Sequence, residues 1–142
     1  MFECLNVYMD ELYKEFILEL NRNPLHKKEL VDFDIEKKAA NKSCGDDVRV
    51  RIKFDTKGNI ANIGYQGQLC AISQAAVSLL LDDVLKKNIS EVCAYDEKKM
   101  IEIFTADVIY TRKKCLLIGL NALLAALRDY KSNPPKFLQE KI

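Results

Sequence analysis

The strongest constraint on the fold is a pair of alternating segments joined by a short turn. From Val48 to Phe54 apolar residues alternate with basic ones, which is the period of a strand with one face buried. The turn formers DTKGN occupy residues 55–59, and IANIGY at 60–65 returns as a second strand. The sequence therefore predicts an antiparallel hairpin that needs apolar cover on only one side.

Apolar residues at helical spacing flank this hairpin on both sides. The three longest helices are predicted over residues 5–20, from 71 to about 88, and 112–131. Ser90 and Asp96 are expected N-caps of two shorter helices that end by Phe104, and the prolines of NPP at 133–135 end the last helix. These helices supply the apolar cover that the hairpin needs.

A third strand is expected just before the hairpin. Val31, Phe33 and Ile35 alternate with acidic residues there, which is again the period of a strand. We therefore expect an α+β fold, with a small three-stranded antiparallel sheet and helices packed on one face. Residues 1–142 are long enough for a single domain with a real core.

Charge and hydropathy narrow the class of protein. Lysine and arginine number 22 against 21 acidic residues, a balance that argues against nucleic acid or an anionic membrane as partner. The apolar runs are too short to span a bilayer, and the first residues lack the basic start of a secretory signal. We expect a cytoplasmic protein whose five cysteines are free thiols or metal ligands.

Three of the cysteines occupy positions that favour chemistry. Cys44 and Asp46 are two residues apart in an extended segment, so their side chains leave on the same side. Cys70 directly precedes a predicted helix, and Cys115 lies in the first turn of the last helix behind the basic residues 112–114. Helix N-termini and nearby cations favour the thiolate, the form that binds metal or attacks sulfur.

Three thiolates and one carboxylate suit tetrahedral Zn²⁺ or the irons of an iron–sulfur cluster. Without a CxxC pair, spacing alone leaves this open, and a structural zinc domain stays an alternative. Cys4 and Cys93 are expected to be core or incidental thiols, and His26 a solvated loop residue. A hydrolytic cysteine enzyme is disfavoured because His26 is the only histidine and lies near no cysteine.

Four motifs in order give the chain a family resemblance. They are LYKEFILELNRNP at 12–24, CGD at 44–46, GQLCAISQAA at 67–76 and RKKCLLIGLNAL at 112–123. Together they resemble the NifU/IscU/SufU family of iron–sulfur cluster assembly proteins over nearly the whole chain. The resemblance implies a compact domain in which Cys44, Asp46, Cys70 and Cys115 form one exposed ligand set.

The resemblance also implies a function and partners. A pyridoxal-phosphate cysteine desulfurase would deliver sulfur as persulfide, with Cys44 or Cys115 as candidate acceptor. The protein would then build a transient [2Fe–2S] cluster, or hold iron, and pass it to apo iron–sulfur proteins. Such a scaffold is not itself an enzyme. Arg112 and Lys114 would offset the negative charge of the ligands.

Departures from the family pattern leave the subtype open. Lys114 stands where IscU-type members carry histidine, as in SufU-type members, yet the SufU-type insertion between the second and third cysteines is missing. The alternative is therefore a zinc-dependent sulfur acceptor, a sulfurtransferase-type partner of the desulfurase. Leu69 replaces a glycine that usually precedes the second cysteine, which predicts a stiffer or rerouted loop. A degenerate member without a cluster role is disfavoured, because all four ligand positions are filled.

Overall fold

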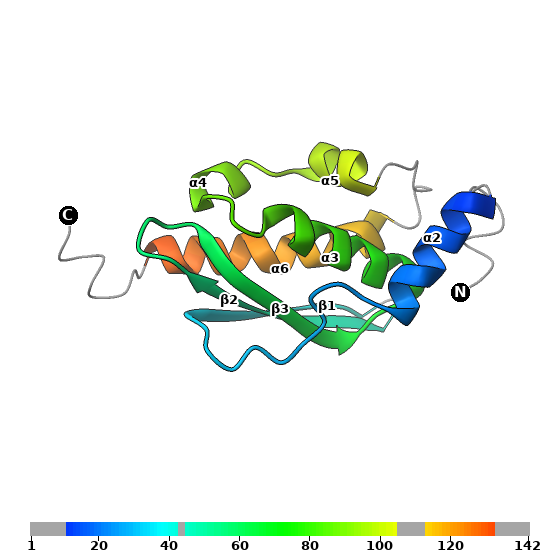
Figure 1. Ribbon diagram of the computed structural model, residues 1–142, viewed down its shortest axis with the longest axis horizontal. Helices are drawn as coiled ribbons and strands as arrows, with labels where there is room; N and C mark the ends of the chain where they lie inside the picture. The colour runs from blue at the N-terminus through cyan, green and yellow to red at the C-terminus, as the bar shows by residue number, and fades with distance from the viewer. Residues whose placement is uncertain (1–10, 43–44, 105–112, 133–142) are drawn as a thin grey trace.

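Figure 1 shows the computed structural model, which describes residues 11–42, 45–104 and 113–132. Its elements are α2 (Glu11–Arg22), β1 (Ile35–Asn41), β2 (Asp46–Phe54), β3 (Ile60–Gln68), α3 (Ala71–Val84), α4 (Ile89–Val92), α5 (Glu97–Phe104) and α6 (Lys113–Ser132). The first half of the helix predicted over 5–20, and the prolines predicted to end the last helix, lie outside the described residues.

The sheet has the strand order β1-β2-β3, and both pairs are antiparallel. The predicted hairpin is confirmed as β2 and β3, joined by the turn at 55–59. Oδ1 of Asp55 accepts the backbone N–H groups of Lys57 and Asn59, each at 2.9 Å, and Gly58 supplies a positive φ of 83°. The turn therefore closes through its own residues.

Helices cover one face of this sheet, as the α+β prediction expected. In Figure 1, α3 and α6 lie against the sheet, and α4 and α5 lie on the side of these helices away from it. The inward row of β2 is almost fully buried beneath them: Val48, Val50, Ile52 and Phe54 are each at most 4% exposed. None of the helices in the described part of the chain is long and apolar enough to cross a membrane.

The two covering helices touch at a glycine. A Cβ atom added to Gly119 of α6 would lie 2.7 Å from Cγ2 of Val77 on α3, closer than real Cβ contacts. The missing side chain lets the helices approach each other. Gly119 lies one turn after Cys115, so this contact also places the start of α6 relative to α3.

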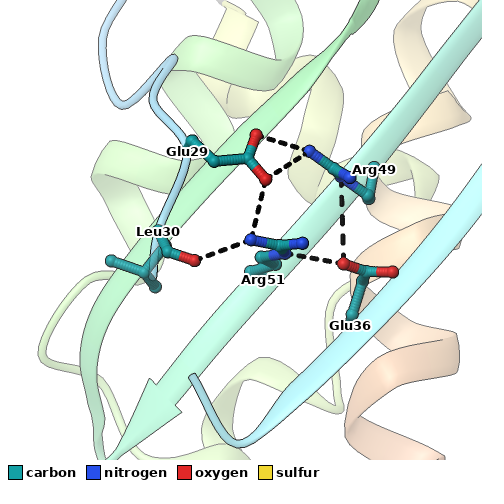
Figure 2. A network of polar contacts seen from close by, with 5 residues as sticks. All are labelled: Glu29, Leu30, Glu36, Arg49 and Arg51. Carbon is teal, nitrogen blue, oxygen red and sulfur yellow. Dashed lines mark hydrogen bonds and ion pairs between the residues drawn. The ribbon is translucent and has the colours of Figure 1, made fainter. Parts of the chain in front are cut away.

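The strand predicted around Val31 and Phe33 is wrong in position. The first strand begins only at Ile35, and Val31 is 86% exposed. The preceding segment instead crosses the outer face of the sheet, where Glu29 contacts Arg49 and Arg51 of β2 (Figure 2). Val31 and Asp32 are both exposed there, so the alternation in the sequence does not correspond to alternating burial.

Two helix boundaries also differ from the sequence prediction. The N-cap of α4 is Asn88 rather than Ser90, because Oδ1 of Asn88 accepts the backbone N–H of Ser90 at 3.0 Å. Helix α3 ends at Val84, and Lys86 turns the chain with a φ of 75°. Asp96 is confirmed as a cap, since its Oδ1 accepts the N–H of Lys99 at 3.0 Å.

Candidate metal centre

Asp46 is the first residue of the inward row of β2. The alternation that buries Val48 also turns Asp46 toward the helices, and it is only 4% exposed. A buried carboxylate must be hydrogen-bonded. Its Oδ1 accepts the backbone N–H of Cys70 at 2.8 Å, and its Oδ2 accepts the hydroxyl proton of Ser73 at 2.6 Å. The start of α3 is thereby tied to the start of β2.

Cys70 is the N-cap of α3, as predicted from its place before a helix. Its Sγ accepts the backbone N–H of Ser73 at 3.4 Å, which is the usual task of a capping side chain. The hydroxyl of Ser73 lies 3.2 Å from the same sulfur. Cys70 is partly exposed, in contrast to the fully buried Ser73.

Cys115 reaches the same place from α6. It is the third residue of that helix, as expected, and is only 2% exposed. Ligand atoms of Asp46, Cys70 and Cys115 all lie within 4.8 Å of one another. The structure thus brings together three of the four predicted ligands, from a strand, a helix cap and a first helical turn. Cys44, the fourth, lies outside the described residues, as do Cys4 and Arg112.

The three groups fit a metal ion in both chemistry and spacing. Thiolate and carboxylate bind Zn²⁺ at about 2.0–2.3 Å, which places tetrahedral ligand atoms about 3.3–3.8 Å apart. The atoms here, within 4.8 Å, need to close by roughly 1 Å. Asp46 and Cys115 are buried and Cys70 is partly exposed, and the carboxylate is a harder ligand than either thiolate. This Asp-Cys-Cys group can hold a metal.

The cluster shifts the acidity of one thiol. A hydrogen bond from Cys115 lowers the pKa of Cys70 most, and the backbone N–H of Ser73 acts in the same direction. Burial and the charge of Asp46 oppose them, and the result is a pKa of about 6, against about 9 for an ordinary thiol. At neutral pH, Cys70 is therefore mainly thiolate, as the sequence analysis predicted from helix position.

The structure also places two other residues considered in the sequence analysis, Lys114 and Cys93. Lys114 is exposed, and it lines a groove of about 370 Å³ between β1 and α6 together with Lys42 and Lys113. Cys93 is partly buried at the C-cap of α4, which agrees with an incidental thiol.

The expectation that His26 is a solvated loop residue is wrong. Its side chain is 17% exposed, and Nε2 lies 3.0 Å from Oδ1 of Asp82. The backbone explains this placement, because the carbonyl of His26 accepts the N–H of Tyr65 at 3.0 Å. That bond holds the loop against β3, so His26 packs on the fold rather than extending into solvent.

Two residues that matter for the geometry were not singled out from the sequence. A Cβ at Gly67 would lie 2.1 Å from the carbonyl oxygen of Asp47, and Gly67 has a φ of 149°. Among the described residues, the positive φ before Cys70 therefore falls on Gly67 and not on Leu69. The other residue is Ser73, whose spacing of three from a helix-capping cysteine was a usable signal.

Comparisons with known proteins agree with this geometry. A sequence profile of the family described as the NifU-like N-terminal domain matches residues 12–136. The iron-sulfur cluster assembly scaffold protein IscU of Thermotoga maritima is 25% identical over 133 residues, which cover 82% of this chain and 93% of that protein. The zinc-dependent sulfurtransferase SufU of Bacillus subtilis is 33% identical over 85 residues, 59% of this chain and 56% of that protein.

A solved structure shares the fold. The N-terminal part of a NifU-like protein from Brucella abortus superposes with a TM-score of 0.74, and the match covers 87% of this chain and 97% of that one. At 21% identity this likeness shows the fold alone. It agrees with the three-stranded sheet and its helical cover.

Proposed function

This chain belongs to the family of the NifU-like N-terminal domain, and on that premise we propose that it is a scaffold for iron–sulfur cluster assembly and transfer. The observation that carries the proposal is the convergence of Asp46, Cys70 and Cys115 within 4.8 Å. We propose Cys44 as the fourth ligand. We also propose that residues 1–142 form one domain, which the continuous match over 12–136 supports.

Sulfur enters, in this proposal, from the persulfide of a cysteine desulfurase. A thiolate of the scaffold attacks the outer sulfur, a new S–S bond forms, and the desulfurase leaves as thiolate, with no net oxidation. Cys44 and Cys115 are the predicted acceptors. Cys115 is 2% exposed, whereas Cys70 is partly exposed and mainly thiolate, so Cys70 joins them as a candidate. Conversion of the persulfide sulfur to sulfide takes two electrons from an external reductant.

Asp46 gives the scaffold a ligand that releases its cargo. A carboxylate binds iron–sulfide more weakly than a thiolate does, which suits a site that must hand its cluster on. Lys114 and Arg112 would offset the negative charge of the ligand set, and the exposed basic groove that includes Lys114 supports this role. The apo acceptors then take the cluster.

Anaerobic reconstitution with iron, cysteine and a desulfurase tests the scaffold directly. We expect visible charge-transfer absorption to grow with the wild-type protein. Asp46→Ala is expected to give a longer-lived cluster and slower transfer to an apo acceptor. The matched control is Asp47→Ala, since Asp47 carries the same charge on the exposed side of the same strand. Faster cluster loss in Asp46→Ala than in Asp47→Ala contradicts the role given to the carboxylate.

A zinc-dependent sulfur acceptor is the second candidate. Lys114 in the place of histidine favours it, as does the likeness to a relative named as a zinc-dependent sulfurtransferase. In that case zinc would be held by the same thiolates and carboxylate, which it keeps deprotonated. Tightly bound zinc after purification, faster desulfurase turnover and no colour on reconstitution would select this function over the scaffold.

A further inference from the structure

Ser73 touches two of the three described ligands with one hydroxyl group. The residue is fully buried in the first turn of α3. Its Oγ lies 2.6 Å from Oδ2 of Asp46 and 3.2 Å from Sγ of Cys70. A serine hydroxyl carries a single proton, so it can donate to only one of these two acceptors at a time.

The geometry indicates where that proton lies when no metal is bound. An ionised carboxylate only accepts hydrogen bonds, and 2.6 Å is the short separation of a charge-assisted O–H···O⁻ bond. The sulfur of Cys70 is the more distant partner, and the backbone N–H of Ser73 already donates to it at 3.4 Å. The hydroxyl proton therefore belongs to Asp46 in this state.

We propose that Ser73 is a positioning residue whose hydroxyl switches between the two ligands. Its proton lies on Asp46 while the carboxylate is free of metal, and turns to Cys70 once a metal bound at Oδ2, or a substitution, removes that oxygen as acceptor. Hydrogen bonding makes a thiolate a weaker nucleophile, so Cys70 reacts fastest before Asp46 is engaged. This orders sulfur chemistry at Cys70 ahead of metal capture by Asp46, a consequence that rests on the proposed function.

A double-mutant cycle on the metal-free, reduced, full-length protein tests the switch. The rate of alkylation of Cys70 by iodoacetamide is measured at pH 9 in the wild type, Ser73→Ala, Asp46→Ala and the double variant. Mass spectrometry resolves the site, since the tryptic peptide from Gly58 to Lys86 contains Cys70 as its only cysteine.

The expected pattern is strongly non-additive. Ser73→Ala alone leaves the rate within about twofold, because the lost proton was on Asp46. Asp46→Ala alone slows Cys70 about tenfold, the scale of one hydrogen bond to a charged group. The double variant returns to the rate of Ser73→Ala. A several-fold acceleration in Ser73→Ala alone, or an Asp46→Ala rate that Ser73→Ala does not restore, overturns the proposal.

Ser78 provides the matched control. It is equally buried on the same helix, but its hydroxyl lies 2.9 Å from that of Tyr65 instead of a ligand. Ser78→Ala must not restore the rate in the Asp46→Ala background; if it does, the effect is general loosening of α3 and the switch is rejected. Should Asp46→Ala not fold, the same cycle is run with Asp46→Asn, whose neutral amide is a weaker acceptor; the same pattern is expected at smaller size, and additive rates overturn the proposal.

The cycle is independent of the proposed function because it contains neither metal nor desulfurase. A scaffold that fails to form a cluster leaves these rates untouched. Additive rates in the cycle would reject the proposed switch of the Ser73 hydroxyl, and the reconstitution experiment would still test the scaffold function separately.

Discussion

The two sides of strand β2 face different environments, although they share one backbone. The inward row runs from Asp46 through Val48 to Phe54 beneath α3 and α6, and its side chains are almost fully buried. The outward row carries Arg49 and Arg51, which bond to acids from a neighbouring strand and from the crossing segment (Figure 2). The same alternation therefore builds a core on one side and, on the other, an ion-pair network of Arg49 and Arg51 with Glu29 and Glu36.

The difference teaches how a single strand can carry a reactive group. An acid on the outer side is matched by arginines: Glu36, paired in register with Arg51, accepts its Nε–H at 2.6 Å. On the inner side, Asp46 accepts the backbone N–H of Cys70 and the hydroxyl proton of Ser73. These bonds hold the Asp46 carboxylate within 4.8 Å of the sulfurs of Cys70 and Cys115, where it can serve as a ligand.

The largest expected effect is the difference in stability lost when a residue of the inner row or of the outer row is replaced by alanine. Ile52→Ala removes a fully buried side chain from the inner row and is expected to lower the free energy of unfolding by about 3 kcal/mol. Its neighbour Lys53 is 36% exposed on the outer row, and Lys53→Ala should cost about 0.5 kcal/mol or less. Urea unfolding of both variants measures the contrast, and equal losses would contradict it.

The next effect concerns the thiol at the inner end of the strand. With its pKa at about 6, Cys70 should be mainly thiolate at pH 7 and be alkylated several-fold faster than an ordinary thiol, because the larger thiolate fraction outweighs the lower nucleophilicity of a low-pKa thiolate. Because Cys115 is the main cause of the lowered pKa, Cys115→Ala should move the alkylation midpoint upward in pH. A pH profile of metal-free protein checks this, and an unmoved midpoint contradicts the assigned cause.

A smaller loss of stability is expected when the ion-pair network on the outer face of β2 is disrupted. Arg51 bonds Glu36, donates to the carbonyl of Leu30 at 3.0 Å and stacks 4.4 Å from the ring of Phe33. Arg51→Ala should therefore lower the free energy of unfolding by about 1 kcal/mol. The control is Arg22→Ala, an exposed pair with Glu19 at 3.1 Å, for which we expect a change near zero.

The pH dependence of the same variant gives the finest distinction. The hydrogen bond from Arg51 holds the pKa of Glu36 below its usual value. A lowered folded-state pKa contributes stability above the unfolded pKa, and that contribution is lost as pH falls through the folded value. The difference between wild type and Arg51→Ala should thus shrink below about pH 4, as followed by unfolding at several pH values. A difference in the free energy of unfolding that does not change with pH would contradict the role given to Glu36.

The period of β2 made one half of the fold and one ligand predictable. Strong alternation from Val48 to Phe54 sets the hairpin, and it also sets Asp46 on the inner side by parity. Strand β1 was misplaced because its sequence, IEKKAAN, has little strand propensity, and its pairing with β2 decides its conformation. Tertiary contact overrode local preference there.

The sequence analysis named the three described residues that the structure brings together, but not how they are hydrogen-bonded. The positions of Cys70 and Cys115 at helix starts follow from sequence, whereas their meeting with Asp46 followed only from the family resemblance. The roles of Ser73 and Gly67 depend on distances of 2.6 Å and 2.1 Å across different elements. No periodic pattern encodes such distances, because they arise from how the helices dock on the sheet.

The contact of Gly119 with Val77 has a thermodynamic consequence. It helps to join the helices that carry Cys70 and Cys115, so the ligand set exists only in the assembled native chain. Any ion held there shifts the folding equilibrium by mass action. An ion bound at this site therefore raises the melting temperature, and its release lowers the melting temperature again.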